Sequence, residues 1–156
     1  MRKISVVILL SVLAFASCKK DNGGSCGTVN ITAPASEVET LRAYITANSI
    51  SATEDARGFF YTINTAGSSD KPSVCNSVTV NYKGTLTNGT QVDAADNVTF
   101  DLSRLIIGWQ EGIPLIGTGG SITLYLPPSL AYGNADYDNI PGNSILIFNI
   151  DLIAIN

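Results

Sequence analysis

Three stretches of the chain alternate apolar with polar residues, which predicts three β-strands that each bury one face. Their apolar positions are Val78, Val80 and Tyr82 in the first stretch, Ile122, Leu124 and Leu126 in the second, and Leu146, Phe148, Ile150 and Leu152 in the third. Asn88-Gly89 follows the first stretch with residue types preferred in a tight hairpin turn, and Pro127-Pro128 ends the second. The pattern therefore predicts antiparallel strands.

A different spacing lies between the first and second strands. Ile106, Trp109 and Ile113 recur at i, i+3 and i+7, as on one face of a short helix, which Pro114 ends or bends. A sheet folded over this one helix is the simplest way to bury all the apolar faces. We therefore predict an α+β fold in which an antiparallel sheet folds over one short α-helix.

The region before these strands predicts an additional short helix and one more strand. The helix is expected to open at Ser36, because residues 36–39 (Ser-Glu-Val-Glu) have the form of a capping box. Its apolar positions, at helical spacing, are Val38, Leu41 and Ile45. Phe59, Tyr61 and Ile63 then alternate like one face of a strand, before the turn-rich run 67–70.

The N-terminus has the features of an export signal. Arg2 and Lys3 precede an apolar run, residues 4–15, that is too short to span a bilayer comfortably, and residues 16–18 (Ala-Ser-Cys) form a small-residue cleavage region. Cys18 in this setting resembles a bacterial lipobox, in which the Cys becomes the lipid anchor. An ordinary secretory signal is the alternative. We expect an exported, membrane-anchored lipoprotein, on the periplasmic face or the cell surface of a bacterium, joined to its domain by a flexible polar tether.

Cysteine and histidine content narrows the chemistry. The chain has 3 Cys and 0 His, which excludes Ser-His-Asp hydrolases, Cys-His proteases and HExxH metalloenzymes. No CxxC spacing indicates a zinc or redox site, so we expect no metal and no cofactor. Export permits a disulfide between Cys26 and Cys75, and two inert free thiols are the alternative. A net charge of -4 argues against nucleic acid as a partner.

Four ordered motifs resemble the FKBP-type peptidyl-prolyl cis-trans isomerases. They are residues 78–89 (Val-Thr-Val-Asn-Tyr-Lys-Gly-Thr-Leu-Thr-Asn-Gly) followed by Asp93, residues 106–112 (Ile-Ile-Gly-Trp-Gln-Glu-Gly), residues 126–133 (Leu-Pro-Pro-Ser-Leu-Ala-Tyr-Gly), and residues 140–141 with 146–152. The resemblance covers more than half of the chain. It implies an FKBP-like α+β fold, with a strongly twisted antiparallel β-sheet wrapped over one short α-helix. Together with the N-terminal pattern, it divides the chain into a lipoprotein signal peptide (1–17), a tether (18–35), an N-terminal helix and strand extension (36–70) and an isomerase domain (71–156).

The resemblance also implies which residues form the site. The residues expected to be catalytic are Asp93, Tyr132, Trp109 and Phe148, and the residues expected to bind substrate are Tyr82, Val92, Phe100, Leu105, Ile106, Tyr137 and Ile140. Trp109 would form the floor of a proline-binding pocket, with Asp93 at its rim and the Tyr132 hydroxyl toward the substrate carbonyl. The implied partners are proline-containing polypeptides of exported proteins, the membrane through Cys18, and macrolides of the FK506 type.

Two departures leave the activity open. Val92 stands where the family often has Phe, and Val98 replaces another common aromatic residue, which makes a pocket wall smaller. Peptidyl-prolyl isomerisation without a covalent intermediate is the function that the resemblance implies. A non-catalytic holdase or surface binding module with an FKBP-like domain is the alternative, and a purely structural surface β-domain would have no apolar pocket at all.

Overall fold

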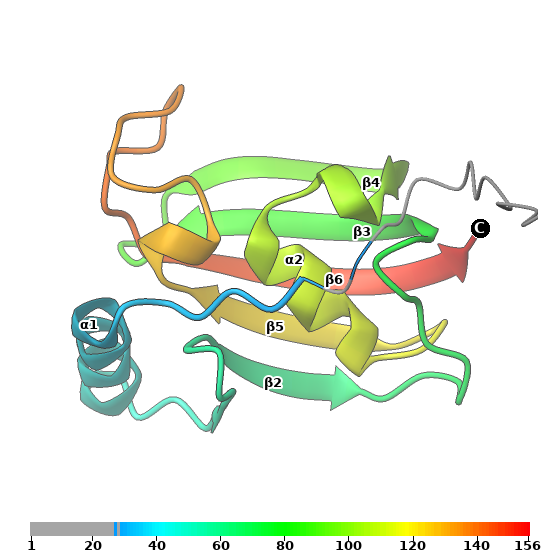
Figure 1. Cartoon of the computed structure of the whole chain (residues 1–156), viewed down its shortest axis with the longest axis horizontal. Coiled ribbons are helices and arrows are strands. Elements are labelled where there is room, and N and C mark those ends of the chain that lie inside the picture. The colour runs from blue at the N-terminus through cyan, green and yellow to red at the C-terminus, as the bar shows by residue number, and fades with distance from the viewer. Residues whose placement is uncertain (1–26, 28) are drawn as a thin grey trace, which may run out of the picture.

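The computed structural model describes residues 27 and 29–156 as one sheet with helices on one face and at one end (Figure 1). The strands are β1 (Thr53–Glu54), β2 (Phe60–Thr65), β3 (Ser77–Leu86), β4 (Gln91–Asp101), β5 (Ser121–Leu126) and β6 (Leu146–Ile155). The helices are α1 (Ala35–Ala47) and α2 (Ile107–Gly112), with three short 3-10 turns, η1 (Leu102–Arg104), η2 (Ile113–Leu115) and η3 (Pro128–Leu130). The predicted α+β arrangement is confirmed.

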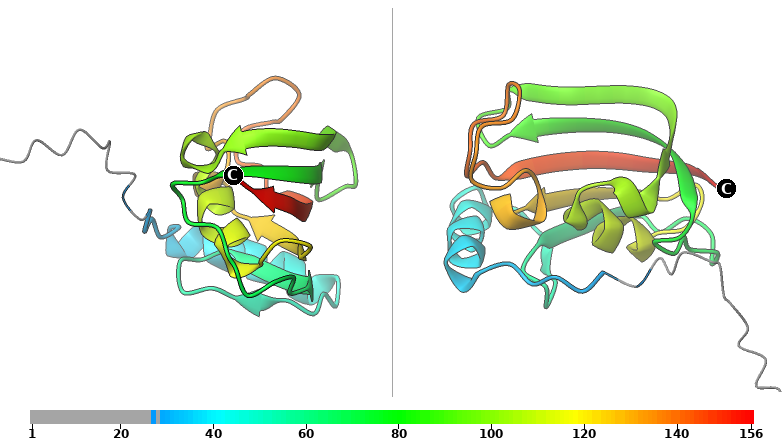
Figure 2. Two further views of the ribbon diagram at one scale, coloured as in Figure 1. Left: turned by 90° about the vertical axis from the view of Figure 1, so that its right-hand side faces the viewer. Right: turned by 45° about the horizontal axis from the view of Figure 1, so that its top comes forward.

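The six strands form one antiparallel sheet in the order β1-β2-β5-β6-β3-β4. The apolar positions predicted from alternation for β3, β5 and β6 are buried, except Tyr82, which is partly buried and packs against the core. The hairpin between β3 and β4 turns at Asn88-Gly89, where Gly89 takes a φ of 84°. The two views of Figure 2 show the twist of the sheet, which curves over α2.

Helix α2 lies against the sheet because glycine allows a close approach there. A Cβ on Gly108 would lie 2.4 Å from Leu126 Cδ2 of β5, and a Cβ on Gly112 would lie 2.6 Å from Leu124 Cδ1. The helix can therefore rest directly on β5 with Trp109 and Ile113 buried. As predicted, the α-helix ends before Pro114 and continues as the 3-10 turn η2.

The start of α1 differs from the prediction. The helix begins at Ala35 with Pro34 as its N-cap and no side-chain capping bond, so Ser36 lies inside the first turn and the capping box does not form. Proline has a fixed φ that a helix start accepts, and the N-cap is Pro34, two residues before the predicted cap Ser36. Ala33 is already packed in the core at 6% exposure, so ordered packing begins before Ser36.

Strand β2 is also only partly as predicted. Phe59 and Phe60 are both buried, whereas Ile63 is 41% exposed. Only Phe60 and Tyr61 pair with β1, so the second half of β2 forms an edge of the sheet, and its register with β5 shifts between Ile63 and Thr65. Among residues 27 and 29–156, the structure contains no helix with the length and apolar character that a bilayer crossing needs.

Candidate active site

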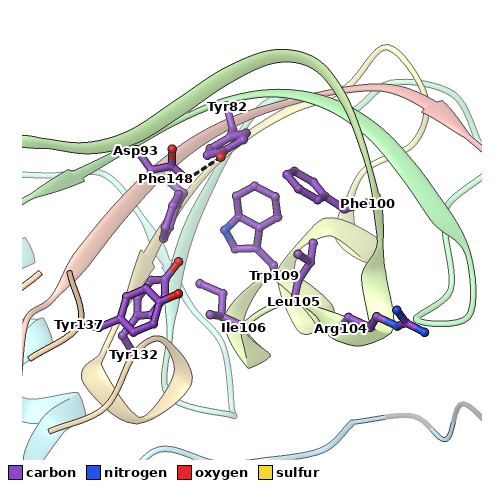
Figure 3. A pocket seen from close by; sticks show the side chains of 10 residues that line it. All are labelled: Tyr82, Asp93, Phe100, Arg104, Leu105, Ile106, Trp109, Tyr132, Tyr137 and Phe148. Atoms are coloured by element: carbon purple, nitrogen blue, oxygen red, sulfur yellow. Dashed lines mark hydrogen bonds between the residues drawn. The ribbon is translucent and has the colours of Figure 1, made fainter. Parts of the chain in front are cut away.

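A pocket of about 290 Å³ opens between the curved sheet and α2. The strands β3, β4 and β6 supply its upper wall, the segment from η1 into α2 its lower side, and the loop after η3 its end (Figure 3). Its lining residues are Tyr82, Asp93, Phe100, Arg104, Leu105, Ile106, Trp109, Tyr132, Tyr137 and Phe148. Most of these side chains are aromatic or aliphatic, so the pocket favours an apolar ligand group.

Trp109 forms the floor and is held by three aromatic rings. Phe148 lies 5.3 Å from the indole at 88°, Tyr82 lies 5.0 Å away at 82°, and Phe100 lies 6.2 Å away at 78°, where each distance joins ring centroids. These edge-to-face contacts fix the position of the ring. Only 4% of Trp109 is exposed, and within the described chain its Nε1 has no hydrogen-bond partner. Such an unsatisfied buried donor is uncommon and suits a group that faces a ligand.

One polar pair lies above this floor. The Tyr82 hydroxyl donates a hydrogen bond to Asp93 Oδ2 at 2.5 Å, which fixes the carboxylate at the rim. Burial raises the pKa of Tyr82 well above its usual 10, and the hydrogen bond to Asp93 raises it further. The phenol therefore stays protonated and remains a donor throughout the neutral range.

A second pair of phenols closes one end of the pocket. Tyr132 and Tyr137 are stacked, with ring centroids 4.7 Å apart and an interplanar angle of 23°, and Figure 3 shows both hydroxyls directed toward the cavity. Burial raises the pKa of Tyr132, with smaller contributions from Tyr137 and Asp93, so its hydroxyl also keeps its proton. The loop of Tyr137 is tied to β4 by Asn139 Nδ2, which donates to the Val92 carbonyl at 3.2 Å.

The structure places nine of the eleven predicted pocket residues on the lining and two elsewhere. Val92 is the extra residue of a β-bulge, since Gly84 pairs with Asp93 and Thr85 with Gln91, and its partly buried side chain packs against the core. Ile140 is buried in the core cluster. Val98 also packs on the core away from the lining, so the expected smaller wall at Val92 and Val98 is not a wall of this pocket.

One lining residue was missed by the sequence reasoning. Arg104 ends the short turn η1, two residues before Ile106, and its Nε lies 3.3 Å from Asp101 Oδ2. Its position directly before the predicted residue Leu105 could have indicated that Arg104 lines the pocket. No periodic pattern of apolar residues marks a three-residue 3-10 turn, however.

The remaining predicted residues bear on chemistry outside the pocket. Cys75 is disulfide-bonded, whereas its predicted partner Cys26 and the predicted anchor Cys18 lie outside the described residues. In residues 27 and 29–156, no three His, Cys, Asp or Glu side chains gather closely enough to hold a metal ion. The lining itself presents phenol hydroxyls, the Asp93 carboxylate, the Arg104 guanidinium and aromatic and aliphatic faces.

Comparison with known proteins agrees with this geometry. The model of the family described as FKBP-type peptidyl-prolyl cis-trans isomerase matches residues 68–153, which include all ten lining residues. The chain belongs to this family. FkpA from Aeromonas hydrophila is 38% identical over 121 residues, covering 75% of this chain and 44% of the relative. Mip from Coxiella burnetii is 37% identical over 124 residues, covering 75% and 54%.

Solved FKBP-type structures share the fold. The crystal structure of FkpA from Escherichia coli superposes with a TM-score of 0.71 at 34% identity, covering 78% of this chain and 60% of that chain. A peptidyl-prolyl cis-trans isomerase from Pseudomonas syringae pv. tomato gives 0.69 at 29% identity, covering 80% and 97%. The chain spans about two fifths of the length of the first curated FkpA relatives.

Proposed function

We propose that this chain accelerates cis-trans isomerisation of the peptide bond before proline in exported polypeptides, from a lipid anchor at Cys18. The observation that carries the activity is the open aromatic pocket over Trp109, with Asp93 and Tyr132 at its edge. Family membership supports the same activity. The N-terminal signal and lipobox pattern support export and anchoring.

The pocket suits the physical problem that this reaction poses. Rotation about an amide bond is opposed by a barrier of about 18–20 kcal/mol, because twisting removes the resonance of the C–N bond. The twisted amide has less charge separation than the planar one, so it loses less solvation when it leaves water. An apolar site such as the one around Trp109 and Phe148 therefore stabilises the twisted form relative to the planar form.

The few polar groups would orient the substrate. Tyr132 keeps a protonated hydroxyl at the end of the pocket, where it can donate to a substrate carbonyl. Within the described chain the Ile106 N–H makes no hydrogen bond, as expected for the first residues of a helix, and it can hold a second carbonyl. Asp93 is fixed by Tyr82 at the rim. No covalent step, metal or cofactor is required.

A soluble form that starts after Cys18 tests the activity. We expect it to accelerate isomerisation of a peptide with Leu before Pro, measured by NMR exchange spectroscopy. The double variant Tyr132→Phe with Asp93→Val should lose roughly 10- to 100-fold in kcat/KM, because both polar contacts at the reacting amide are removed. Lys83→Gln, an exposed residue of β3 outside the lining, is the matched control and should keep the activity.

The same preparation distinguishes the alternatives. No acceleration by the wild-type protein, combined with suppressed aggregation of an unfolded client, would show a holdase instead of an isomerase. A macrolide of the FK506 type should change the fluorescence of Trp109, since the indole forms the floor of the pocket. An unaltered spectrum at saturating macrolide would contradict the proposed pocket.

A further inference from the structure

The pocket carries two opposite charges on opposite sides. Among its ten lining residues, Asp93 and Arg104 are the charged ones. Figure 3 shows Asp93 beside Tyr82 and Phe148 on one side of the Trp109 indole, and Arg104 beyond Leu105 on the other. The site therefore has an electrostatic direction across the floor where the prolyl group would sit.

Other groups strengthen the negative side. The loop that carries the exposed Asp136 and Asp138 is tied to β4 at Val92, directly before Asp93, through the side chain of Asn139. The hydrogen bond from Tyr82 orients the Asp93 carboxylate but leaves its charge in place, because a phenol is neutral. A substrate carboxylate on this side would meet like charge.

On the positive side, Arg104 is the one cation among the ten lining residues. Its side chain is 84% exposed, and its contact with Asp101 runs through Nε. Asp101 also accepts hydrogen bonds from the Ser103 backbone N–H and hydroxyl through Oδ1, so its carboxylate is shared. In the part of the chain that the structure describes, the Nη groups of Arg104 make no hydrogen bond. A guanidinium has five donors, so these groups can bind a carboxylate of a polypeptide that lies over the rim.

We propose that Arg104 makes the site selective for the charge polarity of the segment around the X-Pro bond. A segment with a carboxylate on the flank over Arg104 and a cation on the flank over Asp93 is isomerised faster than the same segment with its charges exchanged. The inference rests on the proposed isomerase function and adds a specificity determinant to it. The effect is modest because the charges are exposed, and it weakens with salt.

Two blocked peptides of identical composition test this, Glu-Ala-Leu-Pro-Phe-Lys and Lys-Ala-Leu-Pro-Phe-Glu. Their kcat/KM values, measured by NMR exchange, should differ about two- to five-fold at low ionic strength, the range expected for exposed charge pairs. The ratio should approach one at about 0.5 M salt, where screening is strong. Because the comparison is a ratio within one protein, a general change in activity cancels.

Charge variants locate the effect. Arg104→Glu leaves a carboxylate on both sides of the floor, so the preference should be lost and the ratio should fall close to one. Asp101→Asn keeps an acceptor for Ser103 but removes the charge that competes for Arg104, so the ratio should widen. Lys83→Gln removes one positive charge from an exposed position of β3 outside the lining and should leave both the ratio and the rates unchanged.

A neutral peptide, Ala-Ala-Leu-Pro-Phe-Ala, separates this inference from the function that it rests on. If the neutral peptide is accelerated but the two charged peptides react equally, or if Arg104→Glu keeps the wild-type preference, the role of Arg104 is overturned while the isomerase function stands. If the neutral peptide is not accelerated either, both fail together.

Discussion

The position of the Phe148 ring depends on a residue that has no side chain. Gly84 of β3 pairs with Phe148 of β6, and a Cβ at Gly84 would lie 2.5 Å from Phe148 Cε1. Real Cβ atoms do not approach other atoms so closely, so the ring occupies space that only glycine leaves free. Phe148 in turn contacts Trp109 edge-to-face. The absence of a Cβ at Gly84 therefore determines where the Phe148 ring lies, and through it the position of the Trp109 indole.

Gly84→Ala should therefore displace the Phe148 ring toward Trp109. We expect the free energy of unfolding to fall by about 1–3 kcal/mol, as for other overpacked sites. We expect kcat/KM to fall roughly tenfold, because the pocket narrows and the indole shifts. Urea denaturation and the peptide assay measure the two effects.

Phe148→Leu provides the matched test of this explanation. In the double variant Gly84→Ala with Phe148→Leu, the shorter leucine side chain makes room for the new methyl group, so part of the lost free energy of unfolding should return. The activity should stay low, because the aromatic wall is missing. A single Gly84→Ala variant with wild-type stability and activity would show that the ring does not need this space.

At this scale the sequence predicted the aromatic residues of the pocket but not all of its outline. Trp109, Tyr82 and Phe148 could be named because they belong to ordered motifs. Val92 could not be placed, because a β-bulge depends on the pairing of two strands and not on either strand alone. Arg104 was missed because only the approach of η1 to the sheet brings it to the pocket.

Among the elements, α2 is held from both sides. Its glycines rest on β5, and on the other side the segment before α1 crosses it, as Figure 1 shows. The Ile31 N–H donates to Glu111 Oε1 at 3.0 Å, and Arg57 Nε lies 3.9 Å from Oε2. The Glu111 side chain is fully buried, and Oε2 has no hydrogen-bond partner within the described chain.

This carboxylate should make stability depend on pH. Burial raises the pKa of Glu111 above its ordinary 4.5, and the Ile31 N–H and Arg57 only partly oppose that effect. A carboxyl whose pKa is raised by folding stabilises the protein fully when protonated, below its ordinary pKa. That contribution is lost as the pH rises through the raised value. Glu111→Gln should therefore flatten the pH dependence above 4.5 and raise the free energy of unfolding at pH 7 relative to the wild type.

Urea denaturation between about pH 4 and 8 measures this effect across the interval where a carboxyl with a raised pKa titrates. Asp151→Asn, an exposed position on β6, controls for the loss of one negative charge. Glutamine keeps an acceptor for Ile31, so a loss of stability at pH 7 in Glu111→Gln would mean that the charge, through Arg57, holds this segment. That result would contradict the expected direction.

The elements themselves were largely predictable, and their ends were not. The spacing of Ile106, Trp109 and Ile113 predicted a helix here, and Trp109 and Ile113 are buried, although Gly108 to Gly112 are all buried and Ile106 and Ile113 flank the α-helix. The predicted start of α1 was wrong. Ser36 and Glu39 have the residue types of a capping box, but Pro34 is the N-cap and Ser36 lies inside the first turn.

For the whole molecule, the order of the strands in the sheet could not be predicted from the local alternation of apolar and polar residues. β2 and β3 follow each other in the chain, yet β5 and β6 lie between them in the sheet. Alternation predicts which face of each strand is buried but not which strand lies next to it in the sheet, because an apolar face can pack against any partner of similar shape. The resemblance to a known family supplied the architecture that periodicity could not.

The predicted attachment to a membrane is also a property of the whole chain, because Cys18 lies far in sequence from the pocket. We expect the full-length protein, expressed in a bacterium that processes lipoproteins, to incorporate labelled fatty acid and to partition into detergent. Two or more acyl chains give stable anchoring, so the membrane fraction should hold nearly all of the protein. Cys18→Ala should abolish the label, with the peptide assay unchanged, because the substitution leaves the domain untouched.

Ser17→Ala is the matched control, since it keeps a small residue before Cys18 and should keep the label. A wild-type protein that is exported without the label would show an ordinary secretory signal and refute the anchor while leaving the proposed activity intact. Protease added to intact cells then separates the two predicted locations. Cleavage of the labelled wild type at the cell surface, but not of a periplasmic marker, would place the pocket outside the cell, and protection of both would place it in the periplasm.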